Sequence, residues 1–252
     1  ALQASLPAWA VSKAPGVSAR SIPLRPSRLA PLSMEADDDE EAPTAAIEPS
    51  STPAQPILRP GVLATGHRLL RGELTHALLE HLPSIAAAQR KTVADAFLAR
   101  RAAELPATVR RQIAAETLAV LEAPEFAALF GSMARAEVAI SAEIAPRDGA
   151  GPPLRITGQI DRLVDLSAEI LVVDYKTNRP PPLEPEQVAD AYLLQLAAYR
   201  LALRGLWPGK IIRCALLWTD GPRIMEIPQS LLDLSESRLW TLGVTGAMPP
   251  SS

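Results

Sequence analysis

The sequence predicts an α/β fold in which helices cover a mixed central sheet. Three observations lead to this prediction. Apolar residues recur at helical spacing between residues 66 and 130, strand-like apolar runs follow between 134 and 176, and one further helical segment separates them from two more strand-like runs at 211–227. Hairpin-linked strands followed by a helical crossover are typical of a sheet with both antiparallel and parallel pairs.

Two regions of the chain differ in composition. Residues 1–60 hold ten of the 25 prolines and an acidic run from Asp37 to Glu41. We expect residues 1–60 to form a Pro-rich, acidic, disordered-like linker, because such a segment cannot bury enough apolar surface to fold alone. Its apolar residues, such as Trp9 and Leu24, leave open the alternative of a docking segment.

Residues 61–252 are expected to form the folded domain, which starts with a helical layer over residues 66–130. The apolar spacing predicts helices from about residue 66 to Leu82, from Ile85 to Ala103 and from Pro106 to Leu121, with Pro83 ending the first. A short fourth helix is expected over Pro124–Phe130, closed by Gly131.

The sheet and its helix are expected over residues 131–228. Strands are predicted at 134–140, 154–166 and 170–176, and the short connection at 167–169 predicts an antiparallel hairpin between the last two. A helix over Pro185–Arg204, stopped by Gly205, leads to strands at 211–219 and 223–227. From Pro228 onward we expect a short helix and a frayed tail.

Composition and missing motifs exclude several classes of protein. The sequence has no apolar run long enough for a membrane span, and a single cysteine, Cys214, cannot build a disulfide framework or a Cys-rich metal site. The folded part carries 20 basic and 21 acidic residues, which argues against a broadly basic surface. It has no phosphate-binding loop, no zinc-protease motif and no nucleophile elbow. Because no secretion signal is recognisable, the cytoplasm is the expected location.

The strongest local signal is Ile170-Leu171-Val172-Val173-Asp174-Tyr175-Lys176-Thr177. An unbroken apolar strand is buried on both faces, and side chains alternate along it, so Asp174 and Lys176 project to the same side. A carboxylate and an ammonium group therefore meet at the end of a buried strand. A salt bridge where the chain reaches the surface is the alternative interpretation.

A second carboxylate, Asp161, lies on the preceding strand. With a turn at residues 167–169, antiparallel pairing places Asp161 beside Asp174. Two adjacent carboxylates repel each other, and a divalent cation with oxygen ligands, Mg²⁺ or Mn²⁺, removes the repulsion. An ion pair between Arg162 and Asp174 without any metal is the alternative.

Two helices carry further candidates. His76 lies one turn before Glu80 on the first helix, which alone is weak evidence for a site. On the helix after the charged strand, Gln195 and Tyr199 share a face, which indicates either a site-facing surface or an ordinary core face.

Four stretches together resemble the PD-(D/E)XK nucleases, and within them the RecB-type exonuclease domain found in bacterial AddA helicase–nuclease subunits. The stretches are Gly72-x3-His76-x2-Leu79-Glu80, Gly158-Gln159-Ile160-Asp161-Arg162, Val173-Asp174-Tyr175-Lys176-Thr177 and Gln195-x3-Tyr199-Arg200. The resemblance covers roughly residues 66–228, and the order and wide spacing of the motifs make it specific. It implies a restriction-endonuclease-like core.

The resemblance also implies roles for individual residues. Asp161, Asp174 and Lys176 would be catalytic, and the metal ligands would be His76, Asp161, Asp174 and the backbone carbonyl of Tyr175. Gln195, Tyr199 and Arg162 would order the site and contact DNA, and Glu137 is a further candidate acid.

The implied activity is Mg²⁺-dependent, or Mn²⁺-dependent, hydrolysis of DNA during double-strand-break repair, with no iron–sulfur cluster and no nucleotide bound by this chain. The implied partners are single-stranded DNA ends from unwound duplex, an AddB-like subunit and helicase domains upstream in the same chain. The alternative is an inactive nuclease-like domain that only binds DNA or serves as a scaffold.

Overall fold

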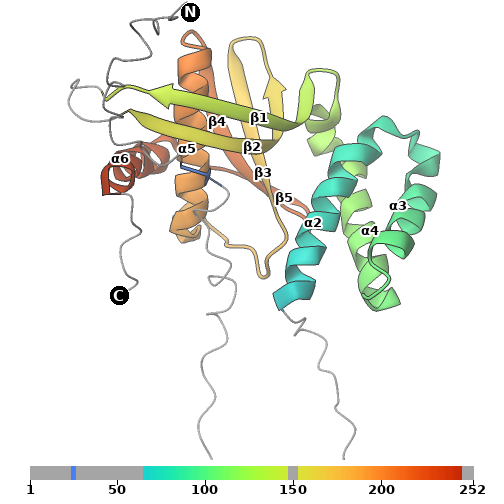
Figure 1. Ribbon diagram of the computed structural model, residues 1–252. Coiled ribbons are helices and arrows are strands. Elements are labelled where there is room, and N and C mark those ends of the chain that lie inside the picture. Colours follow the sequence, from blue (N-terminus) through green and yellow to red (C-terminus); the bar gives the residue numbers. More distant parts are fainter. Residues whose placement is uncertain (1–23, 27–64, 147–152, 246–252) are drawn as a thin grey trace, which may run out of the picture.

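The computed structural model describes residues 24–26, 65–146 and 153–245, and for residues 242–245 only the backbone (Figure 1). The predicted linker therefore lies outside the described residues except for Leu24, Arg25 and Pro26. The rest forms a five-stranded sheet with helices on both faces, as predicted.

The helical layer consists of α2 (Thr65–His81), α3 (Ala87–Arg101) and α4 (Ala107–Glu122), with a 3₁₀ turn at Leu82–Ser84. The predicted short helix over Pro124–Phe130 is a 3₁₀ helix, η5. Leu78, Leu98 and Ile113, one from each α-helix, lie in a small core that the three helices share. This layer has its own apolar interior because each helix is apolar on one stripe only.

The sheet has the strand order β1-β2-β3-β4-β5. Its strands are β1 (Ala134–Ile144), β2 (Leu154–Asp165), β3 (Glu169–Lys176), β4 (Ile211–Trp218) and β5 (Arg223–Glu226). All neighbours pair antiparallel except β3 and β4, which run parallel. The parallel pair requires the long crossover that the sequence predicts after β3.

That crossover differs in detail from the prediction. Pro185–Gln187 form a separate 3₁₀ turn, the chain is extended at Ala189, and α5 runs from Asp190 to Leu206. Gly205 does not stop the helix, because the closing N–H is that of Trp207, which donates to Leu203. The last helix, α6 (Gln229–Thr245), has 17 residues and is not the short helix expected.

The two faces of the sheet bury different side chains. Alternate residues of β3 and β4, such as Val172 and Leu216, pack with α5 and α6 in the larger core. Their neighbours, such as Val173 and Leu217, pack with Leu79 of α2 and with η5. Strands buried on both faces read as continuous apolar runs, which explains the pattern of β3 and β4.

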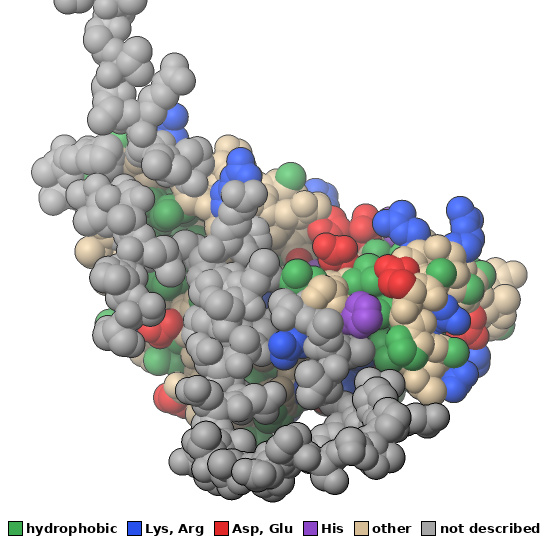
Figure 2. Space-filling view, turned by 60° about the horizontal axis from the view of Figure 1, so that its bottom comes forward, with side chains coloured by type: hydrophobic (Ala, Val, Ile, Leu, Met, Phe, Trp, Pro, Cys, Tyr) green, Lys and Arg blue, Asp and Glu red, His purple; other side chains and the backbone are tan. Residues whose placement is uncertain are grey.

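The surface carries charges of both signs. On the face in Figure 2, basic and acidic side chains are interspersed among apolar and neutral ones. No helix in the described part of the chain is long and apolar enough to cross a membrane.

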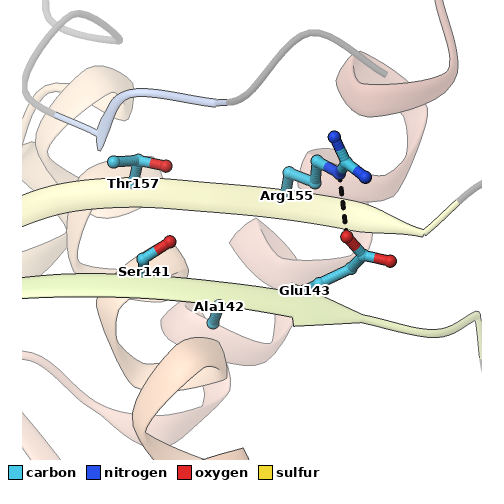
Figure 3. Close-up of a pocket in the computed structure, with 5 residues that line it drawn as sticks. All are labelled: Ser141, Ala142, Glu143, Arg155 and Thr157. Atoms are coloured by element: carbon cyan, nitrogen blue, oxygen red, sulfur yellow. Dashed lines mark hydrogen bonds and ion pairs between the residues drawn. The ribbon is translucent and has the colours of Figure 1, made fainter. Parts of the chain in front are cut away.

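The short segment Leu24–Pro26 lies against the sheet. The N–H of Leu24 donates to the carbonyl of Arg155 at 2.7 Å, and the N–H of Thr157 donates to the carbonyl of Leu24 at 3.0 Å. Figure 3 shows this blue segment beside a pocket of about 330 Å³, which is lined by Ser141, Ala142, Glu143, Arg155 and Thr157. Arg155 and Glu143 pair across it at 2.8 Å, so the two ionic groups in its wall neutralise each other.

Candidate metal and catalytic site

The site lies where β3 leaves the sheet. The Nζ atom of Lys176 is 2.7 Å from Oδ2 of Asp174, and both side chains are buried. They project to the same side of the strand, as the alternation predicts. The pair is not a solvated strand end, because only 3% of the Asp174 side chain and 12% of the Lys176 side chain are exposed.

Helix α5 holds the ammonium group of Lys176 from the other side. Nζ donates to Oε1 of Gln195 at 3.1 Å and lies 3.9 Å from the centre of the Tyr192 ring. Burial lowers the pKa of Lys176, but attraction by Asp174 and Tyr192 outweighs burial and leaves that pKa above its ordinary value. Lys176 is therefore a positive charge fixed in position.

Asp161 enters the site from β2. Arg162 pairs with Val173 and Leu163 with Val172, which is the register predicted for this hairpin. Asp161 and Asp174, the next residues along, are not paired through the backbone. Instead, the N–H of Tyr175 donates to Oδ2 of Asp161 at 2.7 Å. Oδ1 of Asp161 lies 3.4 Å from Nδ1 of His76 on α2.

Strands β1 and β2 are both distorted at this point. Ile160 belongs to the core under α5 and Val164 to the core under α2, although residues four apart in a regular strand share a face. On β1, the residue opposite Asp161 is Glu137, which has a φ of 49° and no partner in the ladder. The left-handed conformation is rare for a residue with a side chain.

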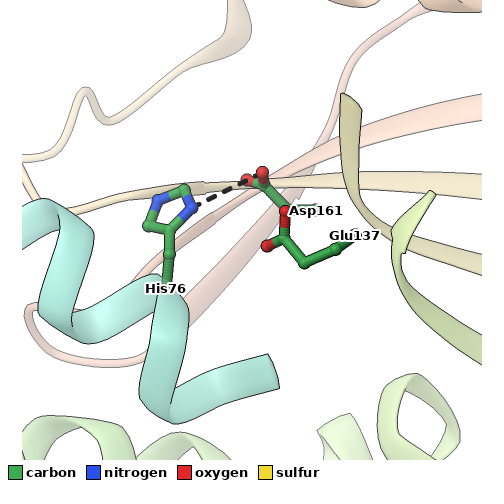
Figure 4. Close-up of side chains that lie close together, drawn as sticks. All are labelled: His76, Glu137 and Asp161. Atoms are coloured by element: carbon green, nitrogen blue, oxygen red, sulfur yellow. Dashed lines mark ion pairs between the residues drawn. The ribbon is translucent and has the colours of Figure 1, made fainter. Parts of the chain in front are cut away.

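The distortion brings a second carboxylate to Asp161 (Figure 4). Ligand atoms of His76, Glu137 and Asp161 all lie within 4.8 Å of one another, in the one such three-residue group found in the described part of the chain. Two carboxylates and one imidazole are a donor set suited to a divalent cation. The residues present therefore fit a metal ion.

The two carboxylates of this cluster, Glu137 and Asp161, repel each other, and His76 is the basic group beside them. Burial raises the pKa of Glu137, and repulsion by Asp161 adds to it. Burial lowers the pKa of His76, but attraction to Asp161 and a hydrogen bond that His76 donates to Asp161 outweigh burial and raise that pKa to about 9. A protonated His76 then supplies the positive charge that the acids require.

Asp174 stands slightly apart from the cluster because Lys176 pairs with it. Burial raises the pKa of Asp174 and repulsion by Asp161 adds to it, whereas Lys176 opposes both. The third member of the metal group, beside His76 and Asp161, is thus Glu137, which the sequence offered only as a further candidate acid. The metal-ligand roles of Asp174 and of the Tyr175 carbonyl stay predictions.

Arg162 makes its described contacts inside the domain, and its contact with DNA stays a prediction. Its side chain is buried, donates to the carbonyl of Leu79 at 2.6 Å and to the hydroxyl of Tyr175 at 2.9 Å, and covers the Phe130 ring. Arg162 therefore fastens α2 to the sheet, and the alternative of an Arg162–Asp174 ion pair is not observed either.

Gln195 and Tyr199 do face the site. The amide of Gln195 donates to the hydroxyl of Tyr199 at 3.4 Å, and that hydroxyl donates to the carbonyl of Gln159 at 2.5 Å. The next residue, Arg200, points away and joins Asp233 and Glu236 of α6. Contact of Gln195 or Tyr199 with DNA stays a prediction.

An ionic network beside the site was not foreseen from the sequence. Glu116 of α4 pairs with both Arg71 of α2 and Arg179 of the loop after β3, and Arg179 also pairs with Asp220. These residues lie up to 149 positions apart and carry no local pattern. A long-range network of this kind has no signal in a single sequence.

Of three comparisons with known proteins, one identifies the family of the chain. No curated protein matches the chain. Among solved structures, the one titled "Crystal structure of SSO0001" aligns at 16% identity over 74% of this chain and 89% of that chain, with a TM-score of 0.34, too low to support an argument about the fold. The family model described as "PD-(D/E)XK nuclease superfamily" matches residues 58–231. That match spans the helical layer, the whole sheet and every candidate residue above, and the chain therefore belongs to the PD-(D/E)XK nuclease superfamily.

Proposed function

We propose that the chain is a metal-dependent DNA exonuclease domain that hydrolyses phosphodiester bonds. The observation that carries this proposal is the fixed Lys176 ammonium group beside Asp174, within one half-buried site that also holds His76, Glu137 and Asp161. Membership of a nuclease superfamily supports the choice of substrate, a phosphodiester.

Each side chain has a defined task in that reaction. His76, Glu137 and Asp161 would hold the metal ion, which supplies charge neutralisation at the phosphate and a more acidic bound water when it is present. Asp174 orients Lys176, whose ammonium group offers hydrogen bonds to the attacking water or to a phosphate oxygen. Gln195 and Tyr192 keep that group aimed at the site.

The finer proposal concerns the biological setting. We infer Mg²⁺ as the natural ion, a RecB-type role like that of the AddA nuclease domain, and work in double-strand-break repair in the cytoplasm. Upstream helicase domains of the same chain and an AddB-like subunit would deliver single-stranded ends. The four motifs and their order support the RecB-type role. The near-neutral charge of the folded part supports delivery by other domains, because the domain offers little positive charge of its own for binding DNA.

The test is a nuclease assay on end-labelled linear and circular DNA, single- and double-stranded, with Mg²⁺, with Mn²⁺ and with EDTA. An exonuclease should shorten linear DNA from its ends, spare circles and stop in EDTA. Cutting of circular DNA would show that the activity is that of an endonuclease and not of an exonuclease. An absence of cutting together with an absence of Mg²⁺ or Mn²⁺ binding would favour the scaffold alternative.

Two substitutions locate the activity, each with a matched control. Asp161→Asn and Lys176→Met should each lower kcat by about 10²–10³, the usual cost of removing one stabilising group from a transition state. Asp165→Asn and Lys210→Met change the same residue types in an ion pair at the other end of the hairpin, outside the candidate site. Equal rates for Lys176→Met and Lys210→Met would overturn the role of Lys176.

A further inference from the structure

The inner edge of β2 is only half covered by the sheet. β2 pairs with β1 from Leu154 to Val164, but with β3 only from Arg162 to Asp165. Residues 154–161 therefore present unpaired backbone groups on the side away from β1, and such an edge accepts another extended segment. In the described structure that segment is Leu24, which forms a parallel bridge with Ile156.

Leu24–Pro26 is anchored by side chains as well as by backbone. Leu24 packs against the core under α5, and Pro26 is buried. A Cβ atom placed on Gly158 would meet Pro26 Cδ at 3.1 Å and Tyr199 Cε1 at 3.0 Å. The absence of a side chain at residue 158 thus lets the segment and α5 close on β2 from two sides.

A chain of contacts leads from that point to the catalytic lysine. Pro26 and Tyr199 meet over Gly158, the Tyr199 hydroxyl donates to the carbonyl of the next residue, Gln159, and the Gln195 amide donates to Tyr199. Gln195 in turn accepts a hydrogen bond from Lys176. Every link joins buried or half-buried groups, so a shift of β2 at Gly158 displaces the support of Lys176.

We propose that residues 24–26 are an integral part of the catalytic domain, and that Leu24 and Pro26 are positioning residues for Lys176. This inference rests on the proposed function for its catalytic consequence only. The family match begins at residue 58, so the segment lies outside it. A domain cut at residue 58 would keep every candidate site residue and lose this support.

The test uses the full chain with Leu24→Asp, which places a charge at an apolar anchor. Amide hydrogen exchange at Thr157, whose N–H bonds to Leu24, should accelerate by about tenfold or more as that hydrogen bond opens. Labelling of Lys176 by an amine-acylating reagent should rise, and kcat should fall with KM for DNA unchanged. Gly158→Ala should act in the same direction from the opposite side.

Matched variants separate positioning from general damage. Leu24→Ile restores an apolar anchor and should behave as the parent, and Leu234→Asp places the same charge on an exposed position of α6. Exchange at Cys214, in the middle of β4, reports whether the fold is intact. If Leu24→Asp leaves Thr157 exchange unchanged, the docking is wrong.

If Thr157 opens while Lys176 labelling and kcat stay at parent values, the positioning role is wrong. Should neither parent nor variants cut DNA with any divalent metal, the nuclease proposal fails, and the exchange and labelling experiments still decide this inference.

Discussion

Glu137 places its carboxylate at the metal group, and to do so its backbone adopts an unfavourable left-handed conformation. Its φ of 49° lies in the region that residues with a Cβ avoid, at a cost of about 1–2 kcal/mol. Residues held in such conformations are concentrated at functional sites. The distortion turns Glu137 toward His76 and Asp161, whereas a regular β1 would pair it across the ladder.

We predict that Glu137→Gly does not lower the free energy of unfolding of the metal-free protein. Glycine removes the Cβ penalty, which offsets the roughly 0.5–1 kcal/mol that glycine costs in a strand. Ala139→Gly, at an exposed and regular position of β1, should show that cost undiminished. Urea unfolding in EDTA measures both. If Glu137→Gly lost more free energy of unfolding than Ala139→Gly, the backbone of Glu137 would not be strained.

We predict that Glu137→Gln weakens Mn²⁺ binding by at least about tenfold, the size of effect found even for groups that only support a ligand. The amide keeps the volume of the side chain and loses its negative charge. Glu143→Gln, on the same strand but in the Arg155 ion pair, is the control. Calorimetric titration with Mn²⁺ gives both affinities, and equal values would remove Glu137 from the ligand set.

The sequence predicts the residues of the site better than its geometry. Asp161, Asp174 and Lys176 follow from strand periodicity and hairpin register, which are local properties. The left-handed backbone at Glu137 does not, because it depends on how two strands bend together. The burial of Arg162 is equally hidden, since its acceptor, the carbonyl of Leu79, lies 83 residues away.

At the scale of elements, α2 is the part that must be docked correctly, because it carries His76. Its last turn is held by Arg162, and its first half by the Arg71–Glu116 pair to α4. The contact between the His76 and Tyr175 rings, 5.5 Å apart at 76°, adds a third attachment. Besides the apolar packing of Leu79 on the sheet, these contacts fix the position of α2 and of His76.

We predict that Arg162→Met lowers the free energy of unfolding by about 2–3 kcal/mol, because hydrogen bonds from a charged group are worth about 1.5–3 kcal/mol. Mn²⁺ affinity should fall with it, since His76 loses its fixed position. Arg135→Met, at an exposed position of β1, is the control. If Arg162→Met had the free energy of unfolding of the parent and bound DNA more weakly, Arg162 would instead contact DNA, as the sequence predicts.

Three strands are joined by one arginine at the far edge. Arg213 of β4 pairs with Glu169 of β3 and Glu226 of β5. The hydrogen bond from Arg213 lowers the pKa of Glu226 below its ordinary value of 4.5. The pair therefore stabilises the protein above that pH, and the contribution disappears as the pH falls through the lower folded-state value.

We predict that Arg213→Gln costs about 0.2–1 kcal/mol for each exposed ion pair at neutral pH and progressively less below the ordinary pKa of glutamate. Denaturant unfolding of parent and variant from pH 7 down to pH 3 measures the difference. Lys91→Gln, in an exposed pair within α3, controls for the loss of a surface charge. A difference that grows in acid would contradict the assignment.

Helix and strand order is well predicted because apolar periodicity is a local record of burial. The errors fall where tertiary contacts decide the ends. The last helix continues to Thr245 because Leu232 and Leu239 enter the large core and Glu236 receives Arg200. For the same reason α5 passes through Gly205, whose permissive backbone does not by itself end a helix.

At the scale of the whole molecule, composition predicts a linker and a folded domain. Residues 24–26 lie within the predicted linker in sequence, but they pack on the folded domain. Leu24 bridges to β2 and Pro26 is buried, although their neighbours in sequence have the composition of a linker. A three-residue docking segment has no periodicity to reveal it. The near balance of charge, by contrast, is fixed by composition and bears directly on DNA binding.

We predict that the chain binds single-stranded DNA weakly and with a shallow dependence on salt. Each neutralised phosphate contributes about −0.7 to the slope of log K against log salt for a single strand, so two or three contacts give a slope of about −1.4 to −2. Binding measured by fluorescence anisotropy in Ca²⁺ over a range of salt concentrations gives this slope. A variant with Asp37, Asp38 and Asp39 changed to Asn tests whether the acidic run opposes binding. A slope as steep as that of proteins with six to ten phosphate contacts would show that the domain grips DNA unaided, and the need for delivery by other domains would disappear.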